Sequence, residues 1–128
     1  LNNTMEPFDD IRVRQAVAHA IDIAAIHAGV LSGVGSLGGS FESNAVSGSN
    51  TELPHYPFDP DRSRALLAEA GFPDGFSTTF YTPVGRYTMD RHVAEAVQAQ
   101  LPDLGIRASI QAPEFGALQD LLRVGPLS

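Results

Sequence analysis

Apolar residues recur every three to four positions near the start of the chain. The five positions that follow this rhythm are Val13, Ala16, Val17, Ala20 and Ile21. A 3.6-residue repeat predicts a helix with one buried face. Asp9 or Asp10 is placed to cap its amino terminus. Asp22 predicts a second cap and a following helix over residues 23–31, although one continuous helix through Asp22 fits the same pattern.

The charged residues around this helix start have a favourable spacing. Asp10 precedes Arg14 by four positions, which predicts an ion pair on the helix surface. Arg12 and Arg14 are expected to tie the entering chain to the first helix rather than to bind an anion.

The character of the chain changes over residues 33–53, which are rich in glycine, serine and asparagine. This composition predicts a flexible loop that is long for a compact domain. Phe41, Ala45 and Val46 are the apolar residues available to anchor it.

A helix, a glycine and a strand then follow in order. Asp59 and Pro60 form a strong helix start, with a capping acid and a proline at the first helical position. Gly71 is placed to end the helix. Residues 73–75 read Pro-Asp-Gly, a turn, and residues 76–81 alternate as a strand.

The same order occurs a second time. A helix is expected from residue 88 or 90 to residue 104, and Pro102 should distort its last turn. Its apolar face consists of Val93, Ala94, Val97 and Leu101. Gly105 ends it, residues 106–111 alternate as a second strand, and residues 114–123 predict a closing helix.

These two strands flank a helix, so we expect them to be parallel neighbours in a βαβ unit of an α/β fold. Two strands do not form a stable sheet alone. Either further strands come from the chain ends, or the unit is part of a larger structure.

Composition excludes several classes of function. The 128 residues carry a formal net charge of −7 and 43% hydrophobic residues, which indicates a globular domain and argues against nucleic acid or an anionic membrane as partner. No apolar run approaches the roughly 20 residues of a membrane span. The opening residues lack a basic stretch followed by an apolar one, so no signal peptide is expected within this chain.

The loop over residues 82–87 holds the best candidate binding residues: Gly85, Arg86 and Tyr87. It connects the end of a strand to the start of a helix, where ligands collect in open α/β sheets, helped by the amides of the helix start. Arg86 would pair with a carboxylate as a fork, and Tyr87 would stack on the ligand. The alternative is a solvated Arg86 and a half-buried packing residue at Tyr87.

Metal binding and catalysis are not expected, and neither is a cofactor. His19 with Asp22 and His92 with Glu95 each have helical spacing, but the pairs lie on separate predicted helices, and a metal site needs three or four convergent ligands. The serines of residues 33–53 lack a nucleophile motif, and the acidic pairs at 9–10 and 59–61 serve as caps. The chain is therefore not predicted to be an enzyme.

Several segments together resemble family 5, the peptide and nickel type, of the extracellular solute-binding proteins of ABC transporters. They are PFDDIRVRQA at 7–16, AID at 20–22, YPFDP at 56–60, LLAEAGFP at 66–73, TPVGRY at 82–87 and AEAVQAQL at 94–101. The likeness is poorest over residues 33–53, which lack the Pro-Pro pair expected there.

The resemblance implies a partial C-terminal lobe of a two-lobed, periplasmic-binding-protein-like α/β fold, with residues 1–128 as one domain. It further implies an exported protein, periplasmic or extracellular and membrane-associated at full length. Oligopeptides or other small solutes would bind between this lobe and a missing N-terminal lobe for delivery to ABC permease subunits. A different hypothesis is a self-contained, non-enzymatic α/β module for interaction or regulation, which would assemble as an oligomer.

Overall fold

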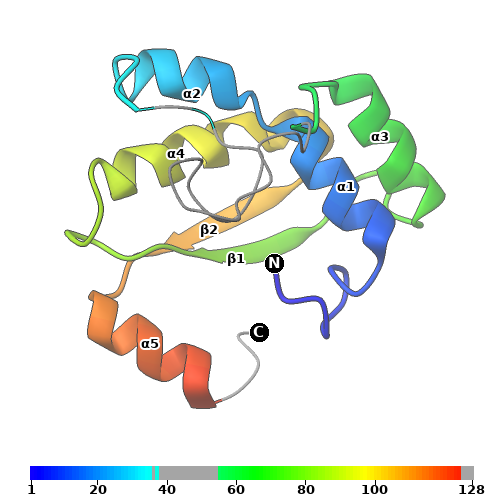
Figure 1. Ribbon diagram of the computed structural model, residues 1–128. Coiled ribbons are helices and arrows are strands. Elements are labelled where there is room, and N and C mark those ends of the chain that lie inside the picture. The colour runs from blue at the N-terminus through cyan, green and yellow to red at the C-terminus, as the bar shows by residue number, and fades with distance from the viewer. Residues whose placement is uncertain (36, 38–54, 125–128) are drawn as a thin grey trace, which may run out of the picture.

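The computed structural model describes residues 1–35, 37 and 55–124, so most of the loop expected at 33–53 lies outside the described residues. The elements are α1 (Ile11–Ala20), α2 (Ile23–Gly29), α3 (Pro60–Glu69), β1 (Ser77–Tyr81), α4 (Asp90–Gln100), the 3-10 helix η1 (Pro102–Leu104), β2 (Arg107–Gln111) and α5 (Phe115–Val124). Figure 1 shows α4 lying along the two strands, and α5 beyond their carboxyl ends. The predicted α/β class is confirmed.

Two separate helices open the chain. The carboxylate of Asp10 accepts a hydrogen bond from the amide of Arg12 at 2.8 Å, and Asp22 accepts one from the amide of Ala25 at 2.9 Å. Ile21 between them is extended, with φ −101° and ψ 114°. Both predicted caps are confirmed, and the alternative of one continuous helix is wrong.

The predicted ion pair between Asp10 and Arg14 is wrong. Asp10 instead pairs with Arg12, whose guanidinium contacts both carboxylate oxygens, the closest at 2.6 Å. The Arg12 guanidinium occupies the carboxylate of Asp10 in this fork. The guanidinium of Arg14 therefore bonds to the backbone, where it donates to the carbonyl of Phe8 at 2.6 Å. Arg12 also donates to the carbonyl of Glu69 at 2.7 Å, which ties the start of α1 to the end of α3.

The segment from α3 to β1 follows the prediction closely. Asp59 caps α3 by accepting from the amide of Arg62 at 2.9 Å. Gly71, just after the helix, has a positive φ of 91°. The amide of Gly75 donates to the carbonyl of Phe72 at 3.0 Å and closes the predicted turn before β1.

The second long helix is shorter than predicted. It was expected to reach residue 104, but α4 ends at Gln100 and η1 follows. Pro102 has no amide hydrogen for the carbonyl of Gln98, which accepts instead from Leu101 at 3.3 Å. Gly105, with φ 75°, then ends η1.

β1 and β2 are parallel, as predicted, and they are the strands of the one sheet within the described residues. Ser77 pairs with Arg107 in this register. An isolated parallel bridge joins Val84 to Glu114 beyond the strands. Both pairs connect residues 30 positions apart, so the segments that leave the two strands continue side by side in one register.

The core lies between α1, α3 and the start of the sheet. Its buried apolar residues are Val13, Ala16, Ala20, Leu66, Leu67, Leu101, Leu104 and Ile106. At its centre the fully buried hydroxyl of Ser63 donates to the carbonyl of Ala16 at 2.7 Å. The predicted apolar faces are thus largely buried, but Val17 and Ile21 of the first face and Val93 and Val97 of the second are only partly buried.

None of the helices in the described ranges is long and apolar enough to span a membrane.

Candidate functional site

The predicted loop lies at the carboxyl ends of the parallel strands, beside a second loop that sequence reasoning did not consider. Gly85, Arg86 and Tyr87 follow β1, and Phe115 begins α5 shortly after β2. The bridge between Val84 and Glu114 holds the two loops side by side. Parallel strands place both of these segments at one edge of the sheet.

Asp90 fixes the conformation of the loop. Its Oδ2 accepts hydrogen bonds from the amides of Arg86 at 3.0 Å and Tyr87 at 3.2 Å, and its Oδ1 accepts from the amide of Arg91 at 2.8 Å. These bonds, the one from Tyr87 contributing most, hold the pKa of the Asp90 carboxyl below its usual value. Gly85 supplies the positive φ of 74° that the turn requires.

This arrangement changes what the loop offers a ligand. The amides of the helix start were expected to assist a ligand, but those of Arg86 and Tyr87, just before the helix, are already bonded to Asp90. The groups that remain for a ligand are the side chains. Asp90 could have been recognised as an acid in the first turn of the helix, where a negative charge is favoured.

The Arg86 guanidinium lies against two aromatic rings. Its central carbon is 5.2 Å from the ring centroid of Phe115 and 5.6 Å from that of Tyr87. The two rings meet edge to face, with centroids 6.3 Å apart. Cation–π attraction and the ring contact therefore restrict the position of the guanidinium. Phe115 was missed because its place beside Arg86 depends on the strand register.

Arg86 is an exposed cation that takes part in no ion pair among the residues the structure describes; the pairs there join other arginines to carboxylates. Tyr87 is 59% exposed rather than half-buried, while the exposure of Arg86 agrees with the alternative of a solvated charge. The site thus presents guanidinium donors and an open aromatic face. This combination suits a planar anionic group such as a carboxylate, with an apolar neighbour on the ring.

The histidine of the first predicted pair makes structural contacts. His19 Nδ1 lies 2.8 Å from the carbonyl oxygen of Pro57, and its ring meets that of Tyr56 edge to face. His92 is exposed on α4. In the part of the chain that the structure covers, no three histidine or acidic residues gather as metal ligands would.

Known proteins are similar to this chain in sequence and in fold. Residues 1–125 match the family described as bacterial extracellular solute-binding proteins, family 5 Middle. The chain belongs to this family. The heme-binding protein A of Haemophilus influenzae is 32% identical over 99% of the chain, which spans 24% of that protein.

Solved structures also resemble this chain. HbpA2 from Haemophilus parasuis superposes with a TM-score of 0.90 at 34% identity, over all of this chain and 26% of its own. DppA from Helicobacter pylori, in complex with the peptide STSA, has a TM-score of 0.81 at 30% identity, over 92% of this chain and 22% of its own. The family 5 chain described here therefore spans about a quarter of the length of these relatives, and it resembles part of a periplasmic binding protein.

The family consists of solute-binding proteins rather than enzymes, which agrees with the lack of a catalytic motif in the sequence.

Proposed function

We propose that the full-length protein is the extracytoplasmic substrate-binding component of an ABC importer and that it captures short peptides. Arg86 pairs with a carboxylate of the peptide, while Tyr87 and Phe115 form an aromatic wall beside it. The observation that carries this proposal is the exposed Arg86 guanidinium, without an ion pair among the described residues and set between two rings.

Residues 1–128 form part of the C-terminal lobe in this proposal, and a separate N-terminal lobe closes over the peptide. The share of about a quarter of the relatives' length supports this division. Closure around the ligand would produce the form that the permease subunits recognise. The protein acts outside the cytoplasm and is held at the membrane surface.

The site chemistry supports a peptide over other solutes. Asp90 holds the loop in place before any ligand arrives. Little conformational entropy is therefore lost when the loop that carries Arg86 binds a ligand. A free carboxyl terminus matches the guanidinium fork, and a side chain next to it would lie on the Tyr87 ring. One structural relative holds a peptide, STSA, whereas a curated relative is named for heme, so heme is the competitor to test.

Calorimetric titration of the full-length protein tests the proposal, with a panel of di- to tetrapeptides, their carboxyl-terminal amides, and heme. Loss of a charge-assisted bond of roughly 1.5–3 kcal/mol predicts that Arg86→Gln weakens binding of the free-acid peptide by about 10- to 150-fold. Arg86→Lys should recover part of this loss. The amidated peptide should bind weakly to both the wild type and Arg86→Gln.

Arg91→Gln is the matched control, because Arg91 is a nearby exposed arginine already paired with Glu95 at 2.9 Å. It should leave the affinity unchanged. Equal affinity of the wild type and Arg86→Gln for the free-acid peptide would refute the role of Arg86, and binding of heme without any peptide would refute the substrate class.

A further inference from the structure

Met89, in the loop of the candidate site, has a left-handed backbone. Its φ is 56° and its ψ is 25°, and Ser32 is the one other non-glycine residue with a positive φ among the described residues. This conformation is unfavourable for a residue with the Cβ atom of methionine, whereas glycine and asparagine adopt it more readily. The chain therefore keeps a large side chain here at the expense of local stability.

The strained residue belongs to a tight turn within the loop. The carbonyl of Tyr87 accepts a hydrogen bond from the amide of Asp90 at 3.3 Å, which closes a β-turn over residues 87–90 with Met89 in its third position. Glycine or asparagine is the ordinary choice where this position has a positive φ. Because the carboxylate of Asp90 also accepts from the amides of Arg86 and Tyr87, Met89 is held in the same hydrogen-bonded loop as these two residues.

The loop exposes several large apolar side chains around Arg86. Val84 and Met89 are each 41% exposed, and Tyr87 is more exposed still, so all three lie open within residues 84–89. Exposed apolar side chains that gather in one place mark binding surfaces. A strained backbone that persists at such a residue is likewise a pointer to function.

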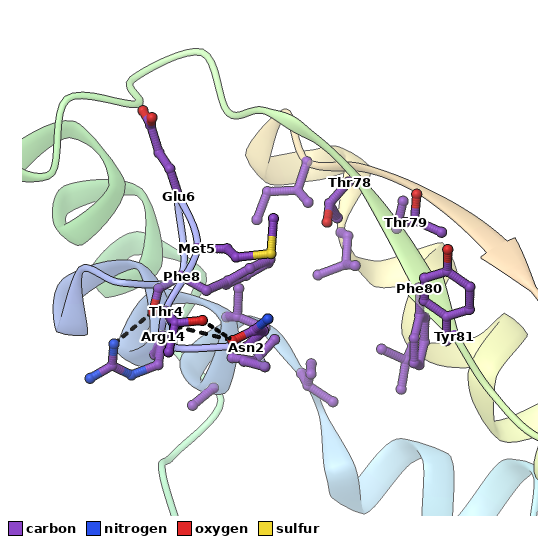
Figure 2. A pocket seen from close by; sticks show the side chains of 18 of the residues that line it. Asn2, Thr4, Met5, Glu6, Phe8, Arg14, Thr78, Thr79, Phe80 and Tyr81 are labelled. Atoms are coloured by element: carbon purple, nitrogen blue, oxygen red, sulfur yellow. Dashed lines mark hydrogen bonds between the residues drawn. The ribbon is translucent and has the colours of Figure 1, made fainter. Parts of the chain in front are cut away.

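The other methionine of the chain is explained by its surroundings. Met5 lines an apolar groove between the opening segment and β1, together with Phe8 and Phe80 (Figure 2). It does not have a positive φ. Met89 is not among the residues that line this groove, so the apolar surroundings that account for Met5 do not account for Met89.

We propose that Met89 helps to select the side chain of the peptide's carboxyl-terminal residue, and that it favours an apolar one. This inference rests on the proposed function, because a carboxylate bound to Arg86 fixes where that residue lies. Its side chain would then meet the apolar surface that Tyr87 and Met89 present in the same turn. Methionine suits this contact because its unbranched thioether adapts to apolar groups of different shape.

Calorimetric titration of the full-length protein with two dipeptides, Ala-Leu and Ala-Gly, tests the proposal. The wild type should bind Ala-Leu more tightly. Met89→Asn should weaken binding of Ala-Leu by about 4- to 15-fold, as expected when one or two methylene groups are no longer buried, and should leave the affinity for Ala-Gly unchanged. Met89→Leu, which keeps an apolar side chain, should retain most of the preference. Unchanged affinity of Met89→Asn for Ala-Leu, or equal losses for both dipeptides, would overturn the proposal.

Urea unfolding separates a ligand contact from a structural role. Met89→Asn relieves the backbone strain and should raise the urea midpoint of the full-length protein while it weakens binding of Ala-Leu. Ser32→Asn is the matched control, because it makes the same relief at an exposed residue outside the site. It should raise the midpoint and leave both affinities unchanged. A lower midpoint for Met89→Asn would show that methionine supports the fold, and it would overturn the proposal.

Arg86→Gln distinguishes failure of this inference from failure of the proposed function. It should weaken binding of both dipeptides to a similar extent, since both carry the carboxylate. If it weakens both and Met89→Asn weakens neither, the inference about Met89 fails alone. If Arg86→Gln changes neither affinity, or if the wild type binds neither dipeptide, the proposed function fails and this inference fails with it.

Discussion

The backbones of Gly75 and Gly105 lie in direct contact. A Cβ atom built on Gly75 overlaps the main chain of Gly105, and a Cβ atom on Gly105 overlaps the carbonyl of Asp74. Each glycine stands two residues before a strand, and the pair keeps the 30-residue offset of the strand register. The two turns thus meet just before the sheet begins, and this close approach aligns β1 with β2.

Replacement of either glycine should be costly. Gly75 and Gly105 have φ values of 76° and 75°, so alanine would combine left-handed backbone strain with a steric overlap. We expect Gly75→Ala and Gly105→Ala to lower the free energy of unfolding by about 2–5 kcal/mol each. Gly71→Ala is the control, since its φ is 91° but open space surrounds it. Urea unfolding that shows the same loss for Gly71→Ala as for Gly75→Ala would contradict the contact.

The buried hydroxyl of Ser63 should contribute measurably to the free energy of unfolding. It bonds to the carbonyl of Ala16 between α1 and α3 and has no exposed surface. Ser63→Ala is expected to cost about 1 kcal/mol of unfolding free energy. Ser63→Val should cost more, because it loses the bond and also crowds the contact between the helices. A valine variant as stable as the wild type by urea denaturation would show that this site is loosely packed.

Asp90 should make the loop sensitive to acid. The amide of Tyr87 and its neighbours lower the folded-state pKa of Asp90 below 3.8. The carboxylate therefore stabilises the fold fully above the unfolded-state pKa, and this contribution is lost as the pH falls through the folded-state pKa. The stability difference between wild type and Asp90→Asn should be constant above about pH 5 and shrink below about pH 4.

Urea unfolding at a series of pH values measures this difference. Asp103→Asn, the same change of charge at an exposed position, is the control and should show a smaller difference from the wild type. If the stability difference between the wild type and Asp90→Asn grows as the pH falls, the carboxylate does not stabilise the folded loop.

Phe115 should make a small contribution to the affinity for a peptide, and Arg86 should make the larger one. A cation–π contact worth roughly 0.5–1 kcal/mol predicts that Phe115→Leu weakens peptide binding by about two- to fivefold. Leu121→Ala, on the same helix, is expected to bind as the wild type does. Titration calorimetry on the full-length protein with a free-acid peptide distinguishes them. Equal losses in both variants would point to a general effect on α5 instead of the ring contact.

Local chemistry made much of the fold predictable. The caps at Asp10, Asp22 and Asp59 and the turn at Gly75 follow from interactions within a few residues. The early end of α4 shows the limit of such reasoning. Pro102 was recognised as a distortion, but the exact change from α-helix to 3-10 helix depends on which carbonyl the adjacent amide reaches.

The candidate site was predictable only in part. Gly85, Arg86 and Tyr87 were expected to form a loop at the end of a strand, and they do. The sequence did not predict that Asp90 would accept the hydrogen bonds of the loop amides. It also did not predict that Phe115 would pack against Arg86. Phe115 reaches Arg86 because the bridge at Glu114 continues the register of a sheet whose strands lie 30 positions apart.

By itself, the sequence determined the helices, the strands, the family and the loop most suited to a ligand, because periodicity, caps and turn residues act over short distances. The tertiary structure decided which distant residues meet. It brought Gly75 against Gly105, joined Arg12 to the end of α3 and placed Phe115 beside Arg86. These pairings depend on strand register and on helix packing, which set distances between segments that no local pattern encodes.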